Sequence, residues 1–358
     1  METGIYSSVP GRDLQDEIYS QVSVQRPLLQ DEEKQIHHIA IPKPFTQQAE
    51  LLDRCQECNL RPKHFSSVWT ETGFIVSICL SQVFDEYLTS GFFALMPVLM
   101  DEFQLSDTSI AWPATVTPLF TSAFLLSFGR LADIYGGFAI YTVGLAWASL
   151  WTTLAGFTNN YTIFMFCRAM QGLGAAAHLP AGLAILGQMY RPGPRKNMVF
   201  SIHGAMAPLG SFVGILVASL VSQYAHWSLY FWIGAVIAIL ALSGTAATRP
   251  SVRPACEEHA LRMDWTGGIG LATSLMLLVF SITEAADVQK WWRSLRIVTT
   301  GIMAVVGMIV TAAVECRFVD QPLVPASVFQ IKYIRPLLLG LLPSYGAVSV
   351  YTCYATLQ

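Results

Sequence analysis

Two carboxyl groups and one guanidinium group interrupt long apolar stretches of this 358-residue chain. Asp85 and Glu86 lie near the middle of the run at residues 73–100, and Arg168 lies inside the run at residues 161–190. An ionised side chain within a membrane span is costly, and insertion scales give ~3 kcal/mol for arginine at the helix centre. Such groups therefore tend to face a cavity or a partner, and they often mark a path for protons or cargo.

Helical periodicity places several of these polar residues on shared faces. Gln82, Glu86 and Thr89 are spaced i, i+4 and i+7, so a helix would present them on one side, with Asp85 about 100° away. The alternative is that the two carboxyls only hydrogen-bond to neighbouring helices and take no part in turnover. The predicted set for substrate binding and proton coupling is Gln82, Asp85, Glu86, Arg168 and Gln171.

The composition indicates that lipid rather than water surrounds most of the chain. The sequence is 53% hydrophobic and only 13% charged, with a mean hydropathy of +0.47, whereas a soluble domain carries about 25% charged residues. A net charge of −3 argues against nucleic acid as a partner. No nucleophile–base, phosphate-loop or metal-ligand pattern appears, and the lone CxxC of Cys55 and Cys58 is interpreted as incidental. We expect no enzyme, no cofactor and no metal.

Successive apolar runs of about 20 residues are long enough as helices to cross the roughly 30 Å hydrocarbon core. The connection at residues 191–197 contains two arginines and a lysine, whereas the connections at 101–108 and around residues 159 and 226 contain neither. This charge bias predicts a cytosolic N-terminus. The predicted spans are residues 73–100, 109–128, 138–156, 161–190, 198–223, 227–247, 264–282 and 297–314, with a last run from 336 to 358.

The segment FGRLADIYGG at residues 128–137 resembles the loop between spans two and three of the major facilitator superfamily. The resemblance implies a polytopic secondary transporter in which the aspartate helps to latch two halves together on the cytoplasmic face. Arg130 is the only basic residue here, and Ile134 and Gly137 stand where the family usually has basic residues. The predicted conformational latch is Gly129, Arg130, Asp133 and Gly136.

The segment RAMQGLG that begins at Arg168 is similar to the family's Arg-x-x-Gln-Gly-x-Gly pattern of span four. The resemblance implies that the arginine serves proton coupling and the electrostatics of the substrate site. The alternative is a snorkelling or structural arginine. Ten residues further on, His178 is interpreted as a packed helix histidine rather than a proton carrier.

The run at residues 198–223 resembles, loosely, the span-five signature of exporters in the superfamily. The usual glycine before the proline is Ala207, and the paired glycines are displaced along the chain. A generic face of small residues for close helix packing explains much of the same pattern. The antiporter-like residues are Gly204, Pro208, Gly210 and Gly214.

The order of segments after residue 247 resembles the fungal fourteen-span drug:proton antiporters, which carry two extra helices between two six-span halves. The loop YRPGPRKN and the double-glycine turn are similar to the aminotriazole-resistance-like branch, some members of which are associated with ammonium or borate movement. The predicted organisation is a disordered cytosolic tail at 1–72, a six-span half at 73–247, a cytoplasmic linker at 248–263, two extra helices at 264–314 and the incomplete start of a second half at 315–358.

The resemblance implies a multi-pass protein of the lipid bilayer that exports drugs or toxic metabolites as small-molecule substrates in exchange for protons. One alternative is low-affinity transport of a small inorganic solute such as ammonium or borate. Another is a truncated, non-transporting membrane protein, because the chain stops after the ninth predicted span begins. The plasma membrane is the expected location, with the vacuolar membrane next.

Overall fold

The computed structural model describes residues 65, 67–104, 111–248, 263–287, 294–319, 321, 323 and 333–357. The chain divides into two units between residues 57 and 58, and all described residues belong to the second unit. The regular elements in these ranges are α-helices. Seven of them, α3 and α5 to α10, are long and apolar enough to cross a membrane. The prediction of an all-α membrane protein is therefore confirmed.

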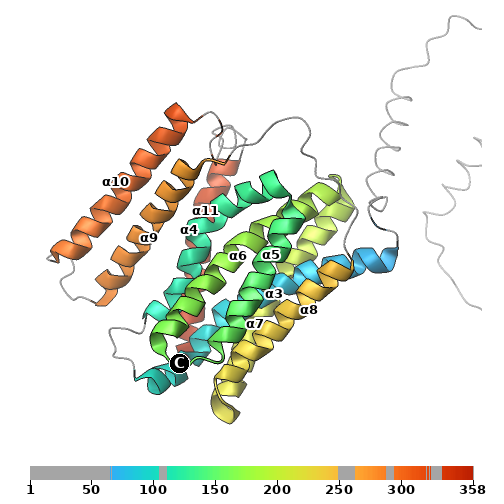
Figure 1. Cartoon of the computed structure of the whole chain (residues 1–358), viewed down its shortest axis with the longest axis horizontal. Coiled ribbons are helices and arrows are strands. Elements are labelled where there is room, and N and C mark those ends of the chain that lie inside the picture. The colour runs from blue at the N-terminus through green and yellow to red at the C-terminus, as the bar shows by residue number, and fades with distance from the viewer. Residues whose placement is uncertain are drawn as a thin grey trace, which may run out of the picture. The chain divides into compact units, whose positions relative to one another are not determined.

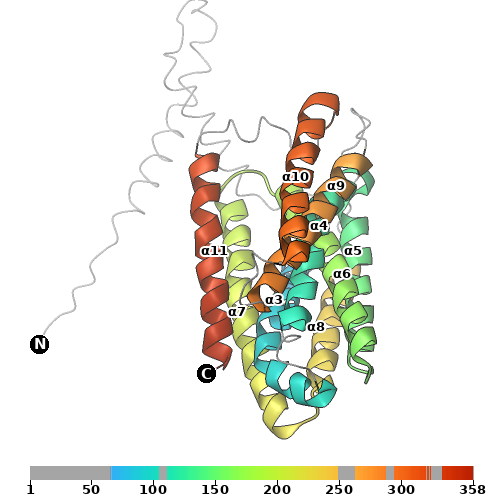
Figure 2. The same ribbon diagram turned by 90° about the vertical axis from the view of Figure 1, so that its left-hand side faces the viewer.

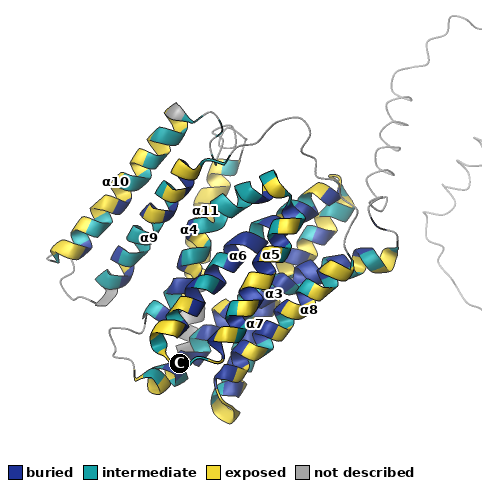
Figure 3. Cartoon of the chain, in the orientation of Figure 1, coloured by how far each residue is buried: buried dark blue, intermediate teal, exposed yellow. Residues whose placement is uncertain are grey.

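Six helices form the main bundle, and their bounds follow the predicted apolar runs closely (Figure 1). Their inward faces are buried and their outward faces are exposed, as expected of helices that meet lipid on one side (Figure 3). The helices are α3 (Val68–Phe103), α4 (Ala111–Tyr135), α5 (Gly137–Ala155), α6 (Tyr161–Met189), α7 (Pro194–Tyr224) and α8 (Ser228–Ala247).

Helix α3 begins at Val68, so the last residues of the predicted tail at 1–72 are helical. The reason is a capping box: the Ser67 side chain accepts from a backbone N–H of the first turn, and Thr70 Oγ1 accepts from Ser67 N at 3.1 Å. Of the predicted tail, residues 1–64 and 66, which include the CxxC, lie outside the described residues. Residues 249–262 of the predicted linker lie outside them as well.

Helix packing divides the bundle into two groups of three helices, which meet where α5 of one group packs against α8 of the other. Helix α3 packs along α7 and α8, while α6 packs along α4 and α5. Contacts between α5 and α8 join the two groups, whereas α3 touches α4 and α6 over much shorter stretches. This arrangement leaves room between α3, α4 and α6, which is where the candidate site lies.

Three further helices follow the bundle. Helices α9 (Trp265–Asp287) and α10 (Leu295–Phe318) pack against each other, and α9 leans on α4 (Figure 1). Helix α11 (Ile334–Leu357) contacts α3, and Figure 2 shows it in red at the edge of the helices. The pair α9–α10 corresponds in order to the two extra helices predicted for the fourteen-span arrangement.

The close approach of α3 and α7 depends on glycine. A Cβ at Gly214 would lie 2.6 Å from the carbonyl oxygen of Tyr87, and a Cβ at Gly210 would lie 2.8 Å from the Glu86 Cβ. Neither position has room for a side chain, so small residues set the distance between these helices. The carboxylate-bearing turn of α3 is therefore held firmly against α7.

The turn between α4 and α5 is shorter than the sequence indicated. Helix α4 continues to Tyr135, so Gly129 is helical and does not turn the chain. The change of direction falls on Gly136, whose φ of 93° lies in the left-handed region that favours glycine. Asp133 consequently lies in the last turn of α4, just before the start of α5.

We predict that Gly214→Ala lowers the thermal unfolding midpoint of the detergent-purified protein, because overpacking costs about 1–3 kcal/mol. The matched control is Gly204→Ala on the same helix, where a Cβ meets nothing within 4 Å. In that exposed position alanine should leave the midpoint unchanged or raise it slightly. Equal midpoints for the two variants would contradict the proposed role of glycine in packing.

Candidate functional site

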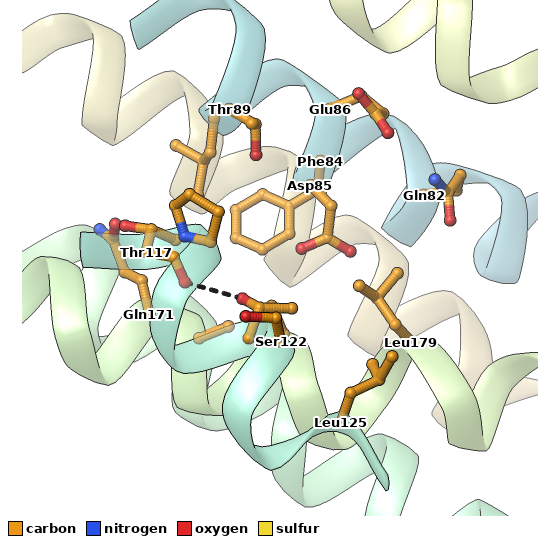
Figure 4. A pocket seen from close by; sticks show the side chains of 15 residues that line it. Gln82, Phe84, Asp85, Glu86, Thr89, Thr117, Ser122, Leu125, Gln171 and Leu179 are labelled. Atoms are coloured by element: carbon orange, nitrogen blue, oxygen red, sulfur yellow. Dashed lines mark hydrogen bonds between the residues drawn. The ribbon is translucent and has the colours of Figure 1, made fainter. Parts of the chain in front are cut away.

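A cavity of about 280 Å³ lies inside the bundle and is lined by side chains of α3, α4, α5 and α6 (Figure 4). It lies near the midpoint of α3, since Asp85 is close to the centre of a helix that runs from Val68 to Phe103. Its polar lining consists of two carboxyls, two amides and several hydroxyls, and no lysine, arginine or histidine appears among the described residues that line it. The polar lining residues are Gln82, Asp85, Glu86, Thr89, Thr117, Thr121, Ser122 and Gln171.

Four of the five predicted substrate and coupling residues line this cavity. Gln82, Asp85 and Glu86 reach it from α3, and Gln171 reaches it from α6. The fifth, Arg168, is not part of the lining: it is 1% exposed, and its guanidinium donates a hydrogen bond to Gln171, which does line the cavity. The i, i+4 and i+7 spacing placed Gln82, Glu86 and Thr89 on one face of the helix, and all three line the cavity.

The two adjacent carboxyls of α3 have different partners and point in different directions (Figure 4). Glu86 Oε2 accepts from the Ser211 hydroxyl of α7 at 3.2 Å, and Ser90 in turn donates to that hydroxyl at 2.9 Å. Asp85 instead points toward α6. Consecutive residues of a helix diverge by about 100°, so each carboxyl meets a different neighbouring helix.

Asp85 contacts His178, a residue that the sequence analysis placed outside the site. Asp85 Oδ2 lies 2.7 Å from His178 Nε2, and His178 Nδ1 lies 2.8 Å from the carbonyl oxygen of Gly174. The imidazole is fully buried, as expected for a packed helix histidine, but it is also the ion-pair partner of a cavity carboxyl. One feature of the sequence could have indicated that His178 lies near the site: Gln171 and His178 are seven residues apart and therefore share a helix face.

Arg168 has an unusual environment for a buried cation. Its guanidinium donates to Gln171 Oε1 at 3.0 Å, and its Cζ lies 4.0 Å from the centroid of the Phe92 ring. Its Nε has no hydrogen-bond partner among the described residues, and no described carboxylate pairs with it. A cation over an aromatic face is attracted by the ring quadrupole, which offsets part of the desolvation cost. Arg168 therefore places a positive charge behind Gln171, whose amide lines the cavity.

The predicted latch and the antiporter-like helix lie away from the cavity lining. Arg130 of α4 donates from Nη2 to Gln321 Oε1 at 3.0 Å, which connects the bundle to the segment after α10. Gly210 and Gly214 face α3, whereas Gly204 and Pro208 are exposed on another side of α7.

A second polar cluster, which the sequence analysis missed, joins the ends of α3, α6 and α7. The carboxylate of Glu71, 3% exposed, accepts from Arg195 Nη2 at 2.7 Å, from Arg195 Nε at 3.1 Å and from the Tyr190 hydroxyl at 2.9 Å. Burial, together with the Glu71 carboxylate, raises the pKa of Tyr190, so its hydroxyl stays protonated and donates. Glu71 was assigned to the tail, and no local pattern links it to Arg195.

Comparison with known proteins defines the class. The profile of the Major Facilitator Superfamily matches residues 78–355, which is most of the chain. The chain belongs to this superfamily and is a multi-pass membrane protein.

Its similar relatives include fungal resistance and efflux proteins, as the resemblance predicted. It is 32% identical to the Aminotriazole resistance protein of Saccharomyces cerevisiae over 87% of this chain and 58% of that protein. It is 32% identical to the Low affinity ammonium transporter of the same yeast over 74% of this chain and 52% of that protein. It is 33% identical to Efflux pump terJ of Aspergillus terreus over 64% of this chain and 45% of that protein. The chain spans about half the length of these relatives.

We predict that Glu71→Ala destabilises the protein by about 1–3 kcal/mol, because it removes a buried carboxylate that accepts three hydrogen bonds and takes the acceptor away from the Tyr190 hydroxyl. A double-mutant cycle with Arg195→Ala, measured by denaturant unfolding in detergent, should give a coupling energy of about 0.5–3 kcal/mol.

The matched control is the pair of Arg296 and Glu284, which has the same 2.7 Å separation but an arginine side chain that is 70% exposed. Water screens such a pair, so its coupling energy should be about 0–1 kcal/mol. A Glu71–Arg195 coupling no larger than this control would show that burial does not strengthen the contact.

Proposed function

We propose that the chain carries the first half of a proton-coupled exporter of small organic compounds such as drugs or toxic metabolites. The observation that carries the proposal is the cavity of about 280 Å³ near the middle of the spans, where two carboxyls and two amides meet inside an apolar bundle. Transporters of this type bind substrate near the bilayer midplane. The names of the relatives, a resistance protein and an efflux pump, support export as the direction.

The proposed division of roles follows the charges. Asp85 and Glu86 supply groups that can gain or lose a proton at the cavity wall, and Gln82 and Gln171 supply neutral hydrogen-bonding contacts to cargo. Arg168 stays charged and holds Gln171 through its 3.0 Å hydrogen bond, so it supplies a fixed positive potential on the side of Gln171 that faces away from the cavity. Protonation of a lining carboxylate from the acidic side would remove its attraction for cargo and favour release.

The ends of the helices support the proposed orientation. Consecutive spans alternate in direction, so the start of α3, the end of α4 and the start of α7 belong to one side of the membrane. These ends carry Arg130, Arg195 and Lys196, and the excess of basic residues favours the cytosol for this side. The contact between Arg130 and Gln321 is consistent with a cytosolic latch formed by Gly129, Arg130, Asp133 and Gly136. The plasma membrane is the proposed location.

The cavity chemistry also favours a second cargo, a small cation such as ammonium. Two carboxyls and no described basic side chain line the cavity, and this charge balance attracts cations. One relative is named as a low affinity ammonium transporter. Borate, an anionic or neutral solute, gains nothing from this lining.

We predict that Asp85→Asn and Arg168→Ala each abolish proton-driven dye transport by the purified chain in liposomes with an imposed pH gradient. The first change removes the proton acceptor and the second removes the fixed charge. The matched controls are Glu284→Gln and Arg296→Ala, which alter an exposed pair and should retain transport. Undiminished transport by both cavity variants would remove these residues from the mechanism.

A separate measurement distinguishes the two cargoes. Uptake of a radiolabelled small amine and of an apolar dye should be compared in the same liposomes, each with the other as competitor. An organic-compound exporter should move the dye and be little affected by the amine, whereas a transporter of ammonium-type solutes should show the reverse preference. Transport of neither would contradict both cargo proposals for this chain.

A further inference from the structure

The His178 imidazole is held by two hydrogen bonds that together restrict where its protons can be. On one side Nδ1 lies 2.8 Å from the carbonyl oxygen of Gly174. A carbonyl oxygen has no proton to give, so Nδ1 must carry a hydrogen and donate it. On the other side Nε2 lies 2.7 Å from Asp85 Oδ2, at full hydrogen-bonding distance.

The second contact requires one more proton. If Nε2 and the Asp85 carboxylate were both deprotonated, a nitrogen lone pair would face an anionic oxygen at 2.7 Å, which is repulsive. One proton between them removes the repulsion, whether it resides on Nε2 as an imidazolium or on Oδ2 as a carboxylic acid. The observed geometry is therefore that of a pair loaded with a single shared proton.

We propose that Asp85 and His178 together form the site that binds the coupling proton, with the buried His178 as the residue that holds this proton against the Asp85 carboxyl of the cavity lining. The proton joins α3 to α6, which otherwise touch over only a short stretch. Loss of the proton breaks this connection and leaves Asp85 as a free carboxylate in the cavity lining. The role in transport depends on the function proposed above, but the shared proton does not.

Other ionisable groups surround the pair and set the field in which it titrates. Glu86 is the next residue on α3, and Tyr141 of α5 presents its ring at a right angle to His178, with centroids 6.2 Å apart. Arg168 lies on α6 three turns before His178. Helix α4 contributes only hydroxyls to the described polar lining, so the one basic group in contact with Asp85 among the described residues is His178, which lies behind the lining.

The Asp85→Asn variant is a discriminating test because it keeps the contact and removes the shared proton. An asparagine amide can donate to the Nε2 lone pair of a neutral imidazole at any pH. Nitrogen-15 NMR of the histidine side chains in the detergent-purified full chain reports the protonation of each ring nitrogen. The signals of His178 are assigned by their absence in His178→Gln.

In the wild type, Nδ1 of His178 should remain protonated throughout the titration. The Nε2 shift and an infrared band of the Asp85 carboxyl group should change at the same pH, because loss of the shared proton removes the hydrogen bond between the two groups wherever the proton resides. In Asp85→Asn the pH-dependent shift of Nε2 should be lost, while the signals of the other histidines, such as His226 beside Ser228, should be unaffected by the substitution. The wild-type spectrum is itself a test that needs no variant to fold, because one histidine must show this pattern.

Two results would overturn the proposal. One is a wild-type His178 whose Nε2 shift does not follow a carboxyl band at any pH, and the other is an Asp85→Asn spectrum in which His178 still titrates as in the wild type. Failure of the transport function is separable from these results. If the liposomes move no cargo while the NMR pattern is present, the exporter is wrong and the proton site stands.

Discussion

Lipid cannot hydrogen-bond to a charge, and this constraint organises the whole structure. Every ionised group within the spans must find a partner inside the protein or raise the free energy of the folded state. Asp85 finds His178, and Glu86 finds Ser211. Arg168 finds Gln171 and the face of Phe92. Each of these pairs crosses from one helix to another or stiffens a helix face, so satisfying the charge also defines how the helices pack around the cavity.

Helix α3 contributes a residue to each of these contacts, namely Asp85, Glu86 and Phe92. Gly210 and Gly214 fix its position against α7, while Tyr87 and Tyr230 bond reciprocally to fix it against α8: the Tyr87 hydroxyl donates to the Tyr230 carbonyl oxygen at 2.8 Å. Its contacts with α4 and α6 are slight by comparison. The cavity therefore lies on the weakly packed side of α3, between α3, α4 and α6.

Glu71 and Asp85, two acidic residues of α3, differ in their partners, and this difference supports the different roles proposed for them. Glu71 receives three donated hydrogen bonds, two of them from a permanently charged arginine, so its charge is fully compensated. Asp85 has a partner whose own charge changes with its proton. The first arrangement connects the ends of three helices, and the second, in the proposal made above, gives a cavity carboxyl two states. Such a division suits a superfamily whose transport depends on rigid groups of helices moving around a central site.

The sequence by itself determined the apolar spans, their order, the charged residues within them and the motifs that resemble this superfamily. Length, hydropathy and helical spacing are local properties, so they also identified Gln82, Asp85, Glu86 and Gln171 as site candidates, and all four line one cavity. Only the tertiary structure decided the pairs. Asp85 meets His178 across 93 positions, and Glu71 meets Arg195 across 124. Such contacts depend on the rotation and relative height of packed helices, and periodicity within one helix does not encode either of them.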